Sequence, residues 1–148
     1  MVLTVTLNPA IDKTVYVESF EEGKLNRVKA SRLDPGGKGI NVSKALFSYD
    51  IAQIATGILA GMNGRLLLSL LEKYSFSKEF LMVSGETRVN LKIVDMKTHR
   101  VTEINESGPK ISENDINEFF KILRQYLAKS DLLVLSGSIP EGVPTDFY

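Results

Sequence analysis

Three short apolar runs stand out along the chain, at Val2–Leu7, Ile51–Leu59 and Leu132–Leu135. They are continuous rather than alternating, rich in branched aliphatic residues and bounded by turn or polar segments, as at Asn8-Pro9. This pattern is typical of strands that are buried on both faces. We therefore expect three core strands in a sheet that is covered on each side.

Three further stretches repeat their apolar residues at helical spacing. In the first, the predicted inward face consists of Val42, Ala45, Leu46 and Tyr49. In the second, Asn63 is a suitable N-cap. The predicted inward face of this second helix consists of Leu66, Leu67, Leu70, Leu71 and Tyr74. In the third, Ser112 and Asp115 have the spacing of a capping box. The stripe that follows consists of Ile116, Phe119, Phe120, Leu123 and Leu127.

Between these elements, the apolar residues recur at every second position instead of at helical spacing. Apolar and polar residues alternate from Val89 to Val94, the segment 95–100 is a turn, and 101–105 returns, which predicts a hairpin. Val15–Val17 and Arg27–Leu33 are shorter strand candidates. We expect these strands, near 13–34 and 87–105, to form a small lid. The alternation of the other strands with helices favours an α/β fold with function at the strand carboxyl ends.

The segment Pro144–Tyr148 reads as the opening of a helix, with Thr145 as its cap. A sheet of three core strands would also leave one edge open to solvent. Both features suggest a truncated or nicked piece of a larger domain. A frayed tail is the alternative.

Composition narrows the classes of function. Eighteen basic and eighteen acidic side chains cancel, so no electrostatic footprint points to nucleic acid or to an anionic membrane. Cysteine is absent and His99 is the only histidine, which excludes thiolate sites and leaves little for a metal cluster. Signal-peptide and membrane-spanning patterns are not present, so we expect a cytoplasmic protein.

The stretch DPGGKGINVSKAL at 34–46 is the best candidate for binding chemistry. Paired glycines before a helix expose backbone N–H groups, and the helix dipole favours negative charge there. Lys38 adds a cation, and the Asn41 amide can point at a bound hydroxyl. The spacing fits neither the P-loop nor the dinucleotide pattern. On spacing alone, a tight turn into a helix explains the stretch equally well.

Four segments together resemble the PfkB branch of the ribokinase-like sugar kinases, in its 1-phosphofructokinase and tagatose-6-phosphate kinase subgroup. They are TLNPAID (6–12), GGKGINVSKAL (36–46), GETRVNLKI (85–93) and LSGSIPEGVP (135–144). They occur in the family's order and spacing and cover almost the whole chain. The resemblance implies a ribokinase-like α/β fold, a parallel sheet flanked by helices with a small β-sheet lid. Residues 1–148 would be the amino-terminal portion of one such domain.

The resemblance assigns sugar contacts to one group of residues. Asp12 matches an aspartate that hydrogen-bonds sugar hydroxyls, although a turn aspartate that caps its own backbone is the alternative. Gly36, Gly37 and Asn41 match residues that contact the sugar. Lys38 accompanies them, with a solvated surface lysine as the alternative. The glycine stretch would then hold the acceptor sugar rather than ATP.

A second group would reach the phosphate already present on the substrate. Arg88 and Asn90 match the family's segment for this role, and a guanidinium suits phosphate oxygens. An arginine on the solvent face of a hairpin is the alternative. Ser138 matches a serine near this phosphate, or is a turn or capping serine. Lys24 and Arg27 align more loosely with lid cations and are as well explained as surface charges.

The family's catalytic base is the aspartate of a GAGD motif, which is absent here, as is the acidic motif associated with Mg²⁺. We therefore expect no catalytic residue and no metal ligand in this chain, which would carry the sugar half and the lid without the ATP half. The intact protein would use ATP and Mg²⁺ to convert fructose 1-phosphate into fructose 1,6-bisphosphate. The alternatives are a tagatose-6-phosphate kinase and a non-catalytic phosphosugar-binding module. A homodimer through the lid strands is also implied.

Overall fold

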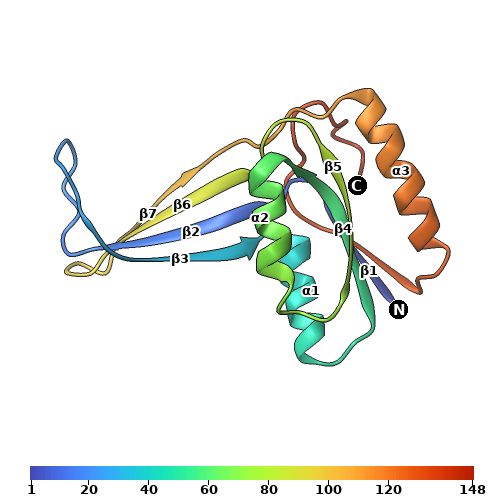
Figure 1. The fold of residues 1–148 in the computed structure, drawn as a ribbon, viewed down its shortest axis with the longest axis horizontal. Helices are drawn as coiled ribbons and strands as arrows, with labels where there is room; N and C mark the ends of the chain where they lie inside the picture. Colours follow the sequence, from blue (N-terminus) through green and yellow to red (C-terminus); the bar gives the residue numbers. More distant parts are fainter.

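The computed structural model describes all 148 residues, which form two four-stranded sheets and three helices (Figure 1). The first sheet is parallel throughout, in the order β5-β4-β1-β8. Its strands are β1 (Val2–Thr6), β4 (Gln53–Ala60), β5 (Ser77–Val83) and β8 (Leu132–Leu135). The helices are α1 (Lys38–Ser48), α2 (Gly61–Leu71) and α3 (Glu113–Leu127).

The parallel sheet is covered on both faces, with α1 and α2 on one side and α3 on the other (Figure 1). Strand β4 is buried along its whole length, and its side chains alternate between two apolar clusters. Ile54 and Ile58 pack with Phe119 of α3, whereas Leu59 packs with Leu67 of α2. Each fully buried side chain of this size contributes about 1.5–3 kcal/mol. Burial on both faces therefore explains the continuous apolar run.

Strand β5 is the element that the apolar pattern misses. It pairs with β4 at the edge of the sheet and is half-buried or exposed at every position. Its first residues, including Lys78 and Glu79, are polar, so the segment lacks the apolar run of a core strand. The parallel sheet has four strands, and the expected number of three is wrong.

The predicted inward face of α1 is also wrong. The buried residues of this helix are Gly39, Ile40 and Ser43, whereas Tyr49 is 77% exposed. The hydroxyl of Ser43 lies 2.6 Å from that of Thr4 in β1, within hydrogen-bond distance. A Cβ atom on Gly39 would lie 2.7 Å from the Val5 carbonyl oxygen. The helix therefore meets the sheet through small and polar residues, which a hydrophobic stripe does not reveal.

The starts of α2 and α3 differ from each other in how they are capped. Helix α3 has the predicted capping box, in which the Ser112 hydroxyl accepts from the Asp115 N–H. Helix α2 begins at Gly61, two residues before the predicted cap Asn63. Its first N–H groups are instead bound by the carboxylate of Glu86, from a distant part of the chain.

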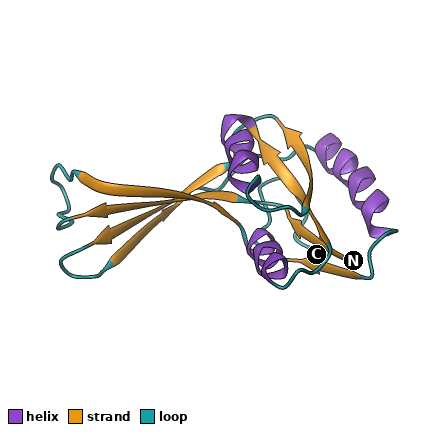
Figure 2. Ribbon diagram, turned by 60° about the horizontal axis from the view of Figure 1, so that its bottom comes forward, coloured by secondary structure: helices purple, strands orange, loops and turns teal.

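The second sheet, called the lid sheet below, extends from the body as a long arm (Figures 1 and 2). Its strands, in the order β3-β2-β6-β7, are β3 (Val28–Gly36), β2 (Ala10–Val17), β6 (Arg88–Asp95) and β7 (Val101–Asn105). β2 pairs with β6 in parallel, and the other two pairs are antiparallel. The two sheets confirm the expected α/β class with a second sheet, but this sheet has four strands like the core sheet and is not the small lid that was expected.

The strand β3 is longer than the expected segment 27–33 and runs directly into the glycine stretch, ending at Gly36. At the other end of the chain, residues 144–148 contain turns and no helix, with the Phe147 N–H donating to the Pro144 carbonyl at 3.2 Å. The expected helical opening at Thr145 is therefore wrong. None of the three helices has the length and hydrophobicity needed to cross a membrane.

Candidate functional site

A polar pocket of about 350 Å³ lies where the lid sheet meets the ends of the core strands. Its lining is contributed by the segments after β1 and β8, the start of α1 and one face of the lid sheet. None of the lining residues is hydrophobic. They are Asn8, Asp12, Gly37, Lys38, Asn41, Arg88, Asn90, Lys92, Glu103, Asn105, Gly137 and Ser138. This position, beyond the carboxyl ends of parallel strands, is where α/β folds commonly bind ligands.

Strand register explains why the lid residues converge. Asp12 lies opposite Asn90, and Asn90 lies opposite Asn105. Lys92 lies opposite Glu103, on the same face. Because side chains alternate across a strand, this face of the lid sheet is polar.

The centre of the pocket carries hydrogen-bond acceptors. The Asn90 Nδ2 amide donates to Asp12 Oδ1 at 3.1 Å. The Oδ1 atoms of Asn90 and Asn8 are buried and have no hydrogen-bond partner. The Asp12 carboxylate keeps acceptor capacity beyond the bond from Asn90, which suits a ligand with hydroxyl donors.

The start of α1 forms the floor. Gly37 is its N-cap, with φ of 119° in the region that favours glycine, and no side chain caps the helix. A Cβ atom at Gly37 would lie 2.8 Å from Thr6 Cγ2, so the backbone passes close to the end of β1. Lys38 and Asn41 extend from this first turn into the pocket lining.

Three cationic side chains line the pocket, Arg88 and Lys92 from the lid strand β6 and Lys38 from α1. The Arg88 Nε donates to the Asn8 carbonyl at 3.3 Å and Nη1 donates to the Glu106 carbonyl at 3.5 Å, both long bonds. Burial lowers the pKa of Arg88, and the charge of Asp12 opposes that shift. Lys92 faces Glu103 at 3.9 Å, a loose and partly exposed pair. Together with Lys38, these side chains offer three cations to an anionic group.

The pocket brings together seven of the residues that the sequence singled out: Asp12, Gly37, Lys38, Asn41, Arg88, Asn90 and Ser138. The eighth, Gly36, lies behind Asp12, and a Cβ atom there would be 2.5 Å from Asp12 Oδ2. Five further lining residues were not predicted from the sequence: Asn8, Lys92, Glu103, Asn105 and Gly137. For Lys92, the available signal was the alternation of apolar and polar residues from Val89, which places Lys92 on the same face as Asn90.

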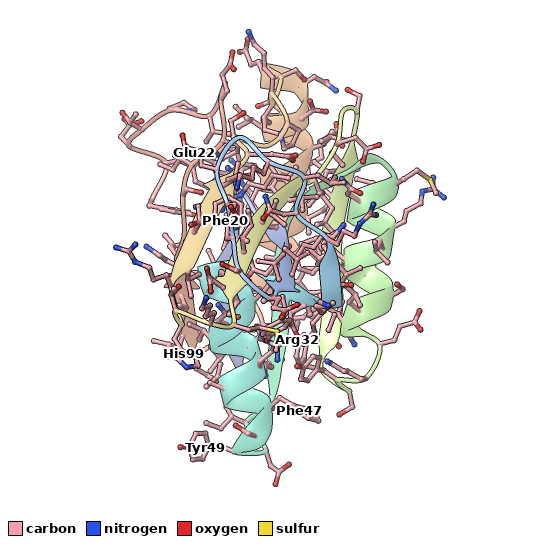
Figure 3. The ribbon with its side chains drawn as sticks, turned by 90° about the vertical axis from the view of Figure 1, so that its left-hand side faces the viewer. Phe20, Glu22, Arg32, Phe47, Tyr49 and His99 are labelled. Atoms are coloured by element: carbon pink, nitrogen blue, oxygen red, sulfur yellow. The ribbon has the colours of Figure 1, made fainter.

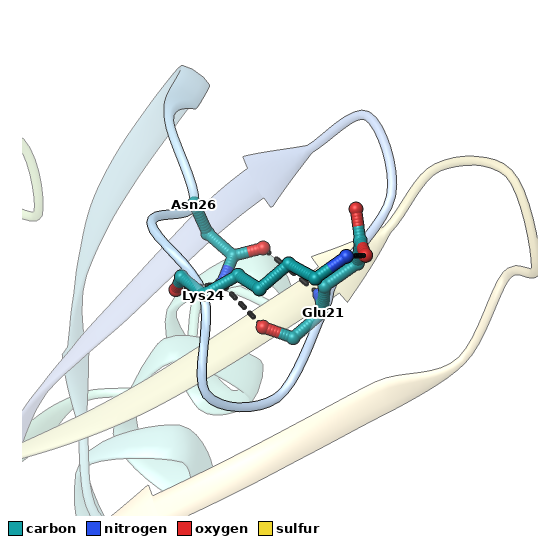
Figure 4. A network of polar contacts seen from close by, with 3 residues as sticks. All are labelled: Glu21, Lys24 and Asn26. Carbon is teal, nitrogen blue, oxygen red and sulfur yellow. Dashed lines mark hydrogen bonds and ion pairs between the residues drawn. The ribbon is translucent and has the colours of Figure 1, made fainter.

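Lys24 and Arg27 are not among the pocket residues. Both belong to the loop at the tip of the lid sheet, where Figure 3 shows Phe20 and Glu22. Lys24 pairs with Glu21, whose backbone N–H donates to Asn26 at 2.9 Å (Figure 4). Arg27 lines a separate hollow at the tip. A substrate role for these two residues therefore has no support from their place in this chain.

The structure contains no group of three or more His, Cys, Asp or Glu side chains that could hold a metal ion. His99 lies in the β6–β7 turn, at the tip of the lid sheet (Figure 3).

Comparison with known proteins gives consistent matches over the whole chain. The chain is 43% identical to 1-phosphofructokinase of Bacillus subtilis and 35% identical to tagatose-6-phosphate kinase of Staphylococcus epidermidis, in both cases over all 148 residues. A crystal structure of a possible 1-phosphofructokinase from Thermotoga maritima superposes with a TM-score of 0.88 and 43% identity. That match covers 97% of this chain and 47% of the other.

The chain spans about half the length of the curated relatives it matches, 48% and 47% of the two enzymes. The family model for pfkB family carbohydrate kinases matches residues 5–148. The fold, the polar pocket and these matches lead to one conclusion: the chain belongs to the pfkB family of carbohydrate kinases.

Proposed function

We propose that the complete protein phosphorylates fructose 1-phosphate to fructose 1,6-bisphosphate with ATP, and that this chain supplies the phosphosugar pocket. The observation that carries the proposal is a pocket without hydrophobic lining that brings the Asp12 carboxylate together with three cationic side chains. A sugar phosphate has the complementary groups, namely hydroxyl donors and a dianionic phosphate.

Each side chain then has a definite task. Asp12, held by Asn90, accepts hydrogen bonds from sugar hydroxyls, and Asn41 and the Gly36–Gly37 backbone support the same end of the ligand. Arg88, with Asn90 and Ser138, binds the phosphate already on the sugar. Arg88 suits this task because its guanidinium is held only by long bonds and can turn its fork toward phosphate oxygens.

These residues bind and orient the acceptor, and none of them is assigned as the catalytic base. Phosphoryl transfer depends largely on positioning and on stabilisation of charge. When bound, ATP with Mg²⁺ supplies the phosphoryl group. We assign no residue of this chain to ATP or to Mg²⁺.

We further propose that residues 1–148 are the amino-terminal portion of one ribokinase-like domain, whose remainder supplies the ATP-binding half. Two features support this: the matched relatives are about twice as long, and β8 pairs with one strand only. Leu132 of β8 is 57% exposed at that edge.

A homodimer through the lid strands is part of the proposal. The lid face opposite the pocket is mostly apolar and has a hollow of about 290 Å³, whose lining is Val15, Val17, Phe20, Val28, Leu91 and Ile93 together with Lys13 and Asn26. Apolar patches on a projecting sheet are typical of surfaces that associate.

A tagatose-6-phosphate kinase is the second candidate, because that enzyme of S. epidermidis also matches the full chain. A substrate panel on the complete protein separates the two. Faster turnover of tagatose 6-phosphate than of fructose 1-phosphate would contradict our choice. Phosphosugar binding with no transfer from ATP to any substrate would favour a non-catalytic binding module.

Arg88→Ala tests the phosphate site directly. In the complete enzyme we expect the KM for fructose 1-phosphate to rise at least tenfold, because a hydrogen bond to a charged group is worth about 1.5–3 kcal/mol. Fructose without phosphate should bind as before. Arg100→Ala, on the same hairpin but exposed at its tip, is the matched control and should leave KM unchanged. Equal losses for both sugars would make Arg88 structural.

A further inference from the structure

The link between the core sheet and lid strand β6 is anchored at the start of α2. This link is residues 84–87, and Arg88 is the next residue. Glu86 Oε1 accepts from the Met62 N–H at 3.1 Å, and Oε2 accepts from the Asn63 N–H at 2.9 Å. One carboxylate thus binds two backbone donors of a helix more than twenty residues away in the chain.

Thr87 adds a second set of bonds to the same place. Its hydroxyl accepts from the Ala60 N–H at 2.8 Å, and its own N–H donates to the Ala60 carbonyl at 2.9 Å. Its carbonyl accepts from Asn63 Nδ2 at 3.0 Å. Thr87 is 1% exposed, and Ala60 is the fully buried last residue of β4. The link is therefore tied to a rigid part of the core.

The backbone at the start of α2 is suited to bind the carboxylate of Glu86. Ala60 is the N-cap of α2 and has no side-chain oxygen, so the first N–H groups of the helix need an acceptor from elsewhere. A negative charge is also favourable at this end of a helix. Gly61 has φ of 60°, and a Cβ atom on it would lie 2.3 Å from the Glu86 carboxyl carbon. The chain leaves room for Glu86 at a position where most side chains would exclude it.

The position of Arg88 depends on this anchor. The bonds of its own side chain are 3.3 and 3.5 Å long and hold the guanidinium weakly. The backbone at residue 88 is held on one side by pairing with Ala10 of β2 and on the other by the bonds of residues 86 and 87. Asn90 and Lys92, further along β6, are placed by pairing with β2 and β7, so Arg88 is the pocket residue that depends most directly on the anchor.

We propose that Glu86 is a positioning residue for phosphosugar binding, which acts through Arg88 and without touching the ligand. The inference rests on the proposed function, because it assumes that Arg88 binds the substrate phosphate. It adds that the affinity for the phosphosugar depends on the Glu86 carboxylate, which binds N–H groups at the start of α2 and is not part of the pocket lining.

The test uses the complete kinase and measures two quantities: the Kd for fructose 1-phosphate by calorimetry without ATP, and kcat. For Glu86→Ala we expect Kd to rise about tenfold, equivalent to about 1.4 kcal/mol, while kcat changes less than threefold. Glu86→Gln keeps one acceptor oxygen and the shape of the side chain, so its Kd should rise by a smaller factor. Glu113→Ala is the matched control, because Glu113 is an exposed acidic residue in the first turn of α3 and is not part of the pocket lining. Its Kd should not change.

A double substitution distinguishes positioning from loss of stability. In an Arg88→Ala background, Glu86→Ala should change Kd less than twofold, since the side chain that it positions is gone. A tenfold loss in that background would overturn the positioning role, and so would an unchanged Kd for Glu86→Ala alone. If Arg88→Ala itself leaves Kd unchanged, the phosphate site in the proposed function is wrong and the role of Glu86 fails with it. If Arg88→Ala raises the Kd and Glu86→Ala does not, the proposed function stands and only the role of Glu86 fails.

Discussion

Gly36 lies against the side chain of Asp12 beside the pocket. The backbone at Gly36 shows no left-handed φ, so conformational freedom does not explain the glycine. The reason is room: a Cβ atom at this position would lie 2.5–2.9 Å from the carboxyl group of Asp12. Glycine here lets the carboxylate lie against the strand and line the pocket.

We therefore expect Gly36→Ala to weaken sugar binding without unfolding the protein. The added methyl group would displace the Asp12 carboxylate and raise the Kd for fructose 1-phosphate about tenfold or more, because a hydrogen bond to a charged group is worth about 1.5–3 kcal/mol. Calorimetry on the complete enzyme gives the Kd, and thermal denaturation monitors folding. In an Asp12→Ala background the methyl group has space, so Gly36→Ala should then add little. An undiminished effect in that background would show that the clash is with another group.

At the scale of elements, the tip of the lid sheet is held by one carboxylate. Asp95 ends β6 and is 7% exposed. It accepts from the Phe20 N–H at 2.9 Å, which joins the loop after β2 to the hairpin. It also accepts from the Lys97 and Thr98 N–H groups at 2.9 and 2.8 Å, which closes the β6–β7 turn. Two separate loops therefore share a single acceptor.

These bonds make the lid tip sensitive to acid. The backbone bonds from Phe20 and Thr98 lower the pKa of Asp95 below its usual value. A lowered pKa means that the stabilisation is complete above the unfolded pKa of about 3.9 and is lost as the pH falls through the lower folded pKa. We expect the amide protection of Phe20 and Thr98, measured by NMR hydrogen exchange, to decrease over that range. Asp95→Asn should lower protection at neutral pH and remove its pH dependence. If the wild type keeps its protection below that range, Asp95 does not hold the tip.

The same elements show how far the sequence predicts the fold. The hairpin of β6 and β7, the capping box of α3 and the strand β8 follow from local patterns, which their residues carry themselves. The incorrect predictions concern contacts between segments that are distant in the sequence. Asn63 resembles a cap, but the donors of α2 are taken by Glu86 from beyond β5.

The residues of the pocket, too, were predicted only in part from the sequence. Asp12, Arg88 and Asn90 follow from family motifs, and strand register brings them together. Glu103 and Asn105 could not be found in this way, because their role depends on lying opposite Lys92 and Asn90 across the hairpin. Asn8 lies within the segment 6–12, but the segment does not distinguish it, and only the structure places it in the pocket lining.

At the scale of the whole molecule, the lid sheet has two faces of opposite character. One face, with Asn90 and Lys92, lines the pocket. The other, with Leu91 and Ile93, lines the apolar hollow. An arm that extends from the body (Figure 2) exposes both faces unless a ligand covers one and another chain the other. Substrate binding and dimerisation are thus proposed for opposite faces of the same four strands.

A single charge on each face tests this division. In the complete protein, Ile93→Asp places a carboxylate in the apolar hollow, where an unpaired charge is costly to bury against another protomer. We expect it to convert a dimer into a monomer in analytical ultracentrifugation. The matched control is Val94→Asp, the next residue on the same strand, whose side chain points to the opposite face. This variant should remain dimeric. Dissociation by both substitutions would indicate damage to the lid sheet itself, and dissociation by neither would mean that any association of the protein uses a surface other than this hollow.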